Sequence, residues 1–458
     1  MLTRAGRRTA AWLGALLLLA ACSQPAPSQS ASGSPSASAS AVASSAVGEV
    51  VPAPGSSSAV YQPNPGAIVV AIDPGHGGCL DWGVPDPRGR GQAFSEKTMT
   101  LAIGLELRRL LQAQGVTVVM TRTTDAALAG DDYAALGCHG APFRDVNGDG
   151  QAGFDPEGKT RTRDELQSRL DLVNLSRADL LVSIHINSIT QNGVAYAIAA
   201  TETYYTDETA WGVTASQPLA RLVQEGVVAA MGPAASYDRQ DRGISATNLY
   251  IVAPPLFVTT PDRPDPVKQP TRGALMPAVL TEVGSITLPA EEDLLLSPAG
   301  QAAAAQGIAN GLASFLGQRD LAVRLDLLAD GGAAGVAPSP IPGTGPLFWA
   351  PVVPATALTN GTAIRLTNTG AARWPLGLRL EVGWSASQDP YLRQAPQRLE
   401  PLPVVVPTLG PGESIELRVS LPAPAGTGRQ IAWITLGTGA APLSDLGSPP
   451  LQVATSTN

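Results

Sequence analysis

Two histidines of the chain lie where buried strands are expected to end, and together they favour a pair of ligands. The alternative for His185 taken alone is a hydrogen-bonded core histidine. His76 lies in "AIDPGHGG" (71–78), among three glycines and a proline, directly after the apolar run 67–72. His185 lies in "VSIHINS", late in the apolar run 179–186. Parallel strands end at one edge of a sheet, where ligands usually bind, so we expect both imidazoles to face one cleft.

Two carboxylates complete a candidate catalytic centre. Glu96 lies at the start of an expected helix over 95–114, which follows the strand that precedes His76 and therefore begins near the same edge. Two neutral histidines and one carboxylate, with a position open for water, form a donor set typical of catalytic zinc. Glu282 ends the expected strand 277–283 and is predicted to act as the base that takes a proton from water. The alternative for Glu282 is a glutamate paired in a salt bridge at a strand end.

Apolar runs and helical patterns alternate between residues 66 and 318. Such alternation predicts an α/β domain, a mostly parallel sheet with helices on both faces. Ser95 can cap the first long helix, and Gly115 follows it. The strands are expected at 67–72, 116–122, 179–186, 249–252 and 277–283, and the helices at 95–114, 164–178, 217–231 and 297–316.

Five blocks of the chain, taken together and in order, resemble the zinc N-acetylmuramoyl-L-alanine amidases of the third sequence family. The resemblance covers residues 66–318 and implies a phosphorylase/hydrolase-like α/β fold. It also implies one Zn²⁺ per chain, held by His76, Glu96 and His185, with Glu282 as the catalytic glutamate. The blocks are "VVAIDPGHGG", "SEKTMTLAIGLELRRLLQAQGVTVVMTR", "TRDELQSRLDLVNLSRADLLVSIHINS", "RGISATNLYIV" and "MPAVLTEVGSIT".

The activity that the resemblance implies is hydrolysis of the amide between N-acetylmuramic acid and L-alanine of the peptidoglycan stem peptide, in cell-wall remodelling. The alternative from another class is a noncatalytic peptidoglycan-binding or hydrolase-activating lipoprotein on the same fold. The complete set of four site residues favours the enzyme. Arg242, in "DRGIS", is interpreted either as a ligand for a substrate or product carboxylate or as part of a surface salt bridge.

Two segments, 130–162 and 253–272, look longer than the minimal family core. Long loops at a sheet edge can widen, cover or block a cleft, and a blocked cleft implies a protein activator. Within the first segment, Asp145, Asn147 and Asp149 have the spacing that opens a calcium loop, although Pro156 replaces the usual glutamate. A solvated acidic turn is the alternative to Ca²⁺ binding.

The cysteines point to an exported protein. Residues 1–22 combine arginines, the apolar run 10–21 and "LAAC", which resembles a lipobox with Cys22 as the lipid-bearing residue. The Ser/Ala/Pro-rich residues 23–65 are expected to form a disordered tether. These features predict a lipoprotein anchored to a membrane in the cell envelope, with an ordinary signal peptide as the alternative. Cys79 and Cys138 then form either a disulfide or two free thiols.

The C-terminal part of the sequence is predicted to form a separate all-β module. After an expected linker over 319–343, residues 344–458 show short alternating runs separated by turns, which predicts a sandwich. The region resembles the immunoglobulin-like domain named for four tryptophans, here Trp349, Trp374, Trp384 and Trp433. We expect these indoles to anchor the core, or else to bind a cell-wall ligand or a protein. The net charge of −8 argues against nonspecific nucleic-acid binding.

Overall fold

The structure is a computed structural model that describes residues 68–147, 152, 163–191, 194–253, 273–328, 353–387, 392 and 395–457. Several predictions concern residues that lie wholly or partly outside these ranges. They are the signal sequence with Cys22, the tether 23–65, Asp149 of the calcium loop, residues 254–272 of the second long segment, residues 329–343 of the linker, and Trp349. Within the described part of the chain, no helix combines the length and apolar character needed to cross a membrane.

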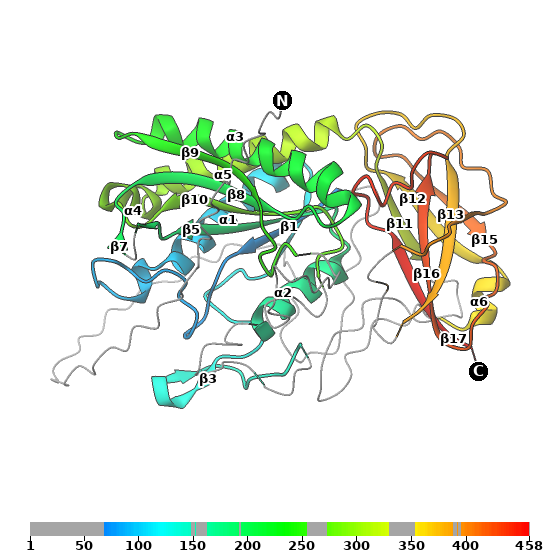
Figure 1. The fold of residues 1–458 in the computed structure, drawn as a ribbon, viewed down its shortest axis with the longest axis horizontal. Coiled ribbons are helices and arrows are strands. Elements are labelled where there is room, and N and C mark those ends of the chain that lie inside the picture. The colour runs from blue at the N-terminus through cyan, green and yellow to red at the C-terminus, as the bar shows by residue number, and fades with distance from the viewer. Residues whose placement is uncertain are drawn as a thin grey trace, which may run out of the picture. The chain divides into compact units, whose positions relative to one another are not determined.

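One six-stranded sheet organises residues 69–285, in the order β2-β1-β5-β10-β8-β9 (Figure 1). The strands β2, β1, β5 and β10 run parallel, whereas β8 is antiparallel to β10 and β9 runs parallel to β8. The prediction of an α/β domain with a mostly parallel sheet is therefore confirmed. The strands are β1 (Val69–Pro74), β2 (Thr117–Met120), β5 (Leu180–Asn187), β8 (Ala199–Tyr205), β9 (Arg239–Ala246) and β10 (Ala278–Ser285).

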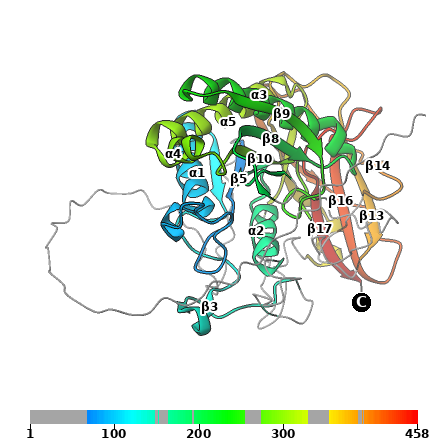
Figure 2. The same cartoon turned by 60° about the vertical axis from the view of Figure 1, so that its left-hand side comes forward.

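Helices cover both faces of this sheet. On one face, apolar side chains of α1, α3 and α5 form the larger core with the strands. On the other face, Leu170 and Val173 of α2 pack with a second apolar cluster. Figures 1 and 2 accordingly show α2 on the opposite side of the sheet from α3 and α5. The helices are α1 (Glu96–Ala113), α2 (Arg163–Ser176), α3 (Gln217–Ala234), α4 (Pro289–Leu296) and α5 (Pro298–Gln318).

The predicted strand at 249–252 is wrong, because this apolar run forms a turn. The N–H groups of Val252 and Ala253 both donate to the carbonyl of Leu249, at 3.0 and 2.8 Å. Ile251 and Val252 are buried against the α2 face of the sheet, so the run is apolar because it packs there, not because it is a strand. Strands β8 and β9 were not predicted from the sequence. The sequence of β9, "RQDRGISA", is largely polar, which suits an edge strand.

The C-terminal part contains a three-stranded sheet, β11-β12-β15, and a four-stranded sheet, β14-β13-β16-β17. Both sheets contribute to one apolar core, in which Trp374 is 1% exposed. Part of the predicted linker is wrong, because residues 323–328 alternate apolar and polar and form β11. The elements are β11 (Val323–Leu328), α6 (Ala355–Thr359), β12 (Thr362–Asn368), β13 (Arg379–Ala386), β14 (Glu400–Pro401), β15 (Ser414–Val419), β16 (Gly428–Gly437) and β17 (Leu451–Thr457).

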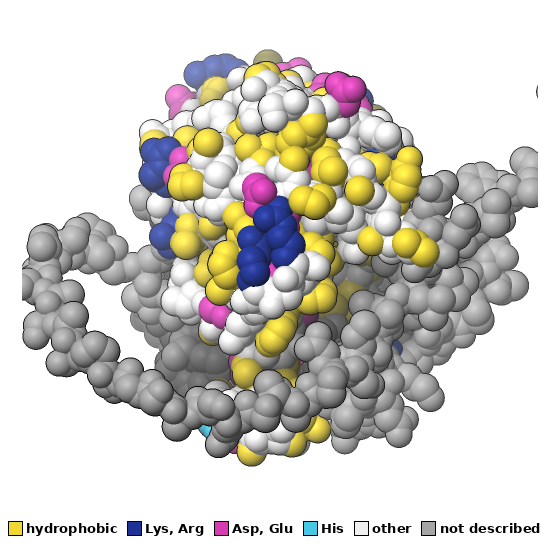
Figure 3. Space-filling view, turned by 90° about the vertical axis from the view of Figure 1, so that its left-hand side faces the viewer, with side chains coloured by type: hydrophobic (Ala, Val, Ile, Leu, Met, Phe, Trp, Pro, Cys, Tyr) yellow, Lys and Arg dark blue, Asp and Glu magenta, His cyan; other side chains and the backbone are white. Residues whose placement is uncertain are grey.

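The described surface carries mixed charge. Figure 3 shows basic side chains in separate small groups, several of them beside acidic side chains, on the face viewed there. Arg88 and Arg90 form ion pairs with the buried Glu292 of α4. This distribution offers no extended basic stripe on that face.

Helices α3 and α5 pack so closely that glycine is required between them. A Cβ on Gly307 would lie 2.6 Å from Val227 Cα and 2.7 Å from the carbonyl oxygen of Gly226. By contrast, a Cβ on Gly317, in the last turn of the same helix, would meet nothing within 4 Å. Close backbone contact is thus confined to the buried face of α5.

We predict that Gly307→Ala lowers the free energy of unfolding by about 1–3 kcal/mol, because the added methyl group overpacks the helix interface. Gly317→Ala is the matched control and should raise the free energy of unfolding by about 0.5–1 kcal/mol through helix propensity. Urea unfolding of the full chain, followed by far-ultraviolet circular dichroism, measures both changes. Equal effects of the two substitutions would contradict the close packing.

Candidate active site

The loop after β1 adopts a compact backbone conformation that depends on its glycines. A Cβ on Gly75 would lie 2.5 Å from the imidazole of His185, so only glycine fits there. His76 itself has a φ of 62°, and Gly77 and Gly78 follow with φ values of 137° and 76°. This left-handed stretch turns the chain sharply at the end of β1 and points the His76 ring at the edge of the sheet.

Two buried arginines fix this loop through its carbonyl groups. Arg122 donates to the carbonyls of Pro74 and Gly75, both at 2.9 Å. Arg169 of α2 donates to the carbonyls of Pro74 at 2.8 Å and His76 at 2.6 Å. Arg169 also forms an ion pair with the buried Asp73 at 2.9 Å. The cost of burying these charges is therefore offset by hydrogen bonds that hold the backbone of the site.

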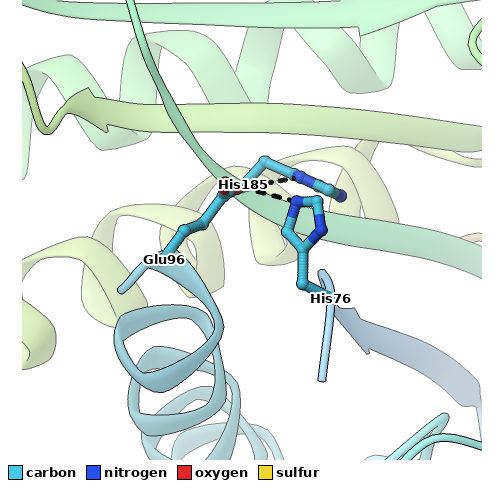
Figure 4. A group of neighbouring side chains, drawn as sticks. All are labelled: His76, Glu96 and His185. Atoms are coloured by element: carbon cyan, nitrogen blue, oxygen red, sulfur yellow. Dashed lines mark hydrogen bonds and ion pairs between the residues drawn. The ribbon is translucent and has the colours of Figure 1, made fainter. Parts of the chain in front are cut away.

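His76, Glu96 and His185 converge at the carboxyl edge of the sheet (Figure 4). Their potential ligand atoms all lie within 4.8 Å of one another. Glu96, the first residue of α1, places Oε2 3.2 Å from His76 Nε2 and Oε1 3.0 Å from His185 Nδ1. The two rings are nearly perpendicular, with 4.8 Å between their centroids. The structure therefore brings together the three residues that the sequence predicted as metal ligands.

The Glu96 carboxylate is buried yet held in its anionic form. Burial alone would raise the pKa of Glu96, but the neighbouring His76 and His185 outweigh it and lower that pKa. The backbone N–H groups of Val84 and Ile186 also donate to its two oxygens, at 2.8 and 2.9 Å. These contacts favour an ionised carboxylate with a fixed orientation, as a metal ligand requires.

Asp81 contacts the site and was not predicted from the sequence. Its Oδ1 accepts a hydrogen bond from His76 Nδ1 at 2.7 Å, which leaves Nε2 facing Glu96. Burial of the imidazole disfavours its charged form, but the carboxylates of Asp81 and Glu96 outweigh this effect and raise the pKa of His76 well above its usual value. A carboxylate on the far nitrogen of a histidine is the usual support for a metal ligand. The available signal was an aspartate in the glycine-rich loop that follows His76.

Glu282 lies beside His185 in the sheet. The two residues are register partners on β10 and β5, so their side chains share one face of the sheet. Glu282 Oε2 is buried and has no hydrogen-bond partner among the described residues. Burial raises the pKa of Glu282 well above its usual value, and the nearby charge of Glu96 raises it further. A carboxyl group with a raised pKa and a free oxygen is suited to accept and return a proton.

The donor set fits zinc. Two imidazole nitrogens and one carboxylate are the three protein ligands of many catalytic zinc sites, and a fourth position stays open in such sites. Within the described part of the chain, this is the group of His, Cys, Asp and Glu side chains whose spacing could hold a metal ion. Glu282, on the strand next to His185, adds a buried Oε2 without a partner among the described residues, an atom that needs a hydrogen bond such as one from water.

The other predicted site residues lie outside the His76–Glu96–His185 group. Cys79 and Cys138 form a disulfide with a Cα–Cα distance of 5.7 Å, which ties the His76 loop to the segment 130–147. Arg242 forms an ion pair with Glu202 at 2.7 Å. In the predicted calcium loop, the N–H groups of Val146 and Asn147 donate to Asp164, and Asp149 lies outside the described residues. Calcium binding by Asp145, Asn147 and Asp149 stays a prediction.

The fold and the site together define a hydrolase-like α/β domain with a candidate metal centre at the carboxyl edge of its sheet. The chain belongs to the N-acetylmuramoyl-L-alanine amidase family, whose model matches residues 70–314. That range contains all four predicted catalytic and ligand residues, His76, Glu96, His185 and Glu282.

Individual relatives are similar over parts of the chain. The germination-specific N-acetylmuramoyl-L-alanine amidase of Bacillus subtilis is 33% identical over 121 residues, which are 26% of this chain and 39% of that protein. An N-acetylmuramoyl-L-alanine amidase of Mycobacterium tuberculosis is 25% identical over 57% of this chain and 91% of its own length. The crystal structure of an amidase from Clostridium difficile 630 is 27% identical, covers 56% of this chain and 99% of its own, and has a TM-score of 0.37. The chain thus spans less than half the length of the germination-specific relative.

We predict that Asp81→Asn lowers the affinity for Zn²⁺ about 10–100-fold, because a neutral amide supports the His76 ligand less well than a carboxylate does. Competition with a chromogenic chelator measures the affinity. Asp207→Asn, at an exposed position, is the control and should leave it unchanged. An Asp81→Asn affinity equal to that of the unaltered protein would show that Asp81 does not support the ligand.

A second prediction concerns Gly83, which lies against two of the predicted ligands. A Cβ there would be 2.4 Å from Glu96 Oε2 and 2.5 Å from His76 Cδ2, whereas a Cβ on Gly89 would meet nothing within 4 Å. The two glycines have similar φ values, 66° and 70°, so alanine strains the backbone equally at both positions. Gly83→Ala should therefore weaken Zn²⁺ binding at least 10-fold more than Gly89→Ala does. A loss of this size is typical when the residues that support a metal ligand are altered. The visible spectrum of the Co²⁺-loaded variants reports the ligand geometry, and identical spectra would contradict the steric argument.

Proposed function

We propose that this chain is a zinc-dependent N-acetylmuramoyl-L-alanine amidase that hydrolyses the amide between N-acetylmuramic acid and L-alanine of the peptidoglycan stem peptide. The observation that carries the proposal is the convergence of His76, Glu96 and His185 beside Glu282. Family membership supports the same substrate class. The cellular role that fits this activity is cell-wall remodelling.

In this proposal, His76 Nε2, His185 Nδ1 and the Glu96 carboxylate hold the zinc ion. When bound there, zinc supplies Lewis acidity, which polarises a carbonyl group and lowers the pKa of a water molecule. Asp81 keeps the proton of His76 on Nδ1, so that the lone pair on Nε2 faces the site. Arg122 and Arg169 hold the backbone that carries His76.

Glu282 performs the proton transfers. Its carboxylate accepts a proton from water as the water oxygen bonds to the lactyl carbonyl carbon. The same carboxyl group then returns that proton to the L-alanine nitrogen as the carbon–nitrogen bond breaks. Burial suits Glu282 to both steps, because a raised pKa lets one carboxyl group serve first as base and then as acid.

The remaining parts of the chain suggest delivery of this domain to the cell wall. We propose that residues 1–22 direct export and that a lipid on Cys22 anchors the protein in the cell envelope, with 23–65 as the tether. We propose that the C-terminal sheets form an immunoglobulin-like sandwich that binds a cell-wall ligand or a protein. Two sheets around one core and the buried Trp374 support that architecture.

The central prediction is that Glu282→Gln lowers kcat/KM for peptide release about 10²–10⁴-fold, the usual contribution of a general acid–base, while Zn²⁺ affinity changes little. Glu225→Gln, on the exposed side of α3, is the matched control and should retain full activity. The assay is release of peptides with N-terminal L-alanine from purified peptidoglycan. A chelator should abolish release, and added Zn²⁺ should restore it.

Two results would decide against the proposal. Release that withstands both the chelator and Glu282→Gln would exclude this mechanism. Tight binding of the Zn²⁺-loaded protein to peptidoglycan without any release would instead favour the noncatalytic alternative.

A further inference from the structure

A row of charged and titratable side chains crosses four strands at the edge of the site. Glu282 of β10 is the register partner of His185 on β5 and of Glu202 on β8. Register partners on adjacent strands place their side chains on the same face of a sheet. The row therefore begins at a predicted metal ligand, passes through Glu282 and continues to Glu202.

A β-bulge extends this row to Arg242 on the edge strand β9. Thr201 pairs with Asp241 and Thr203 with Ile244, so Arg242 and Gly243 together oppose the single residue Glu202. Gly243 adopts a φ of 73°, as such irregularities often require. Bulges commonly redirect a side chain beside an active site. Here the result is that the Arg242 side chain meets the Glu202 side chain.

Glu202 holds Arg242 by one nitrogen. Arg242 Nε donates to Glu202 Oε2 at 2.7 Å, and Ser245 Oγ donates to the other oxygen at 3.1 Å. The Nη atoms of Arg242 have no hydrogen-bond partner among the described residues, and the side chain is 42% exposed. A guanidinium fixed through Nε presents two parallel N–H groups, the geometry that binds a carboxylate with two hydrogen bonds.

We propose that Arg242 binds a carboxylate on the peptide of the substrate and that Glu202 is its positioning residue; this proposal rests on the proposed amidase function. Adjacent strands are about 4.8 Å apart, so the backbone of Arg242 lies about 10 Å from that of Glu282. An extended peptide spans about 3.3 Å per residue, so this distance corresponds to about two or three residues. The carboxylate is therefore that of the second or third residue of the stem peptide, counted from the scissile amide.

The test compares pairs of muramyl peptides that carry either a carboxylate or a carboxamide at the second or third residue. The Zn²⁺-loaded full chain should prefer the carboxylate at one of these positions by about 10–100-fold in kcat/KM, the usual effect of charge-assisted hydrogen bonds. Arg242→Gln should bring this ratio close to one, mainly through KM. Arg242→Lys, which keeps the charge without the planar fork, should give an intermediate ratio.

Glu202→Gln should also reduce the carboxylate preference, because Arg242 then loses its anionic support. Arg221→Gln removes an exposed arginine of α3 that pairs with Glu225, and this control should keep the full ratio. A ratio that Arg242→Gln leaves unchanged, or a wild-type ratio near one at both positions, would overturn the carboxylate site.

A binding measurement separates this proposal from the hydrolase proposal. Isothermal titration of the same peptides into Glu282→Gln protein, with and without Arg242→Gln, reports carboxylate selectivity without turnover. Selectivity that depends on Arg242 supports the site even if the wild-type chain releases no peptide, in which case the hydrolase proposal alone fails. Hydrolysis of both peptides together with equal binding overturns the Arg242 proposal alone.

Discussion

The ion pair between Asp73 and Arg169 is the interaction on which the geometry of the site depends. Asp73 also accepts hydrogen bonds from Thr121 and Ser183, each at 2.6 Å, so one carboxylate connects the end of β1 with the residue that follows β2 and with the middle of β5. Arg169 then carries this connection from α2 to the carbonyl of His76. Such a pair is costly to bury and is stable only when every donor and acceptor is used. The candidate metal-binding edge is thus held by a buried ion pair that is itself supported by several hydrogen bonds.

The convergence of His76, Glu96 and His185 was predictable from the sequence, whereas the contact of Asp81 with His76 was not. His76 and His185 follow from apolar runs that end at one edge, and Glu96 follows from the helix that begins there. The contact of Asp81 with His76 depends on a loop with several left-handed residues, which no periodic pattern encodes. Local signals predict which element carries a ligand, whereas the support of that ligand arises from tertiary contacts.

In the sheet, too, some strands could be predicted from local sequence patterns and others depend on tertiary contacts. Its parallel part was predictable, because buried strands of such sheets are continuous apolar runs. The antiparallel part was not, since β9 is an edge strand with polar residues and 249–252 is apolar only because it packs beneath the sheet. Strand β11 was missed because its alternating pattern was read as part of a linker. The pairing of Glu202 with Arg242 depends on a bulge between β8 and the edge strand β9.

The disulfide between Cys79 and Cys138 makes the covalent support of the His76 loop depend on the redox conditions around the protein. It joins residues that are 59 positions apart and anchors the turn that follows His76. Disulfides form and persist in oxidising compartments and are rare in the cytosol. A newly made chain in reducing surroundings carries every ligand but lacks this covalent tie, and its loop is held by hydrogen bonds and ion pairs alone. An oxidising compartment would therefore supply the last constraint on the turn beside the candidate metal centre.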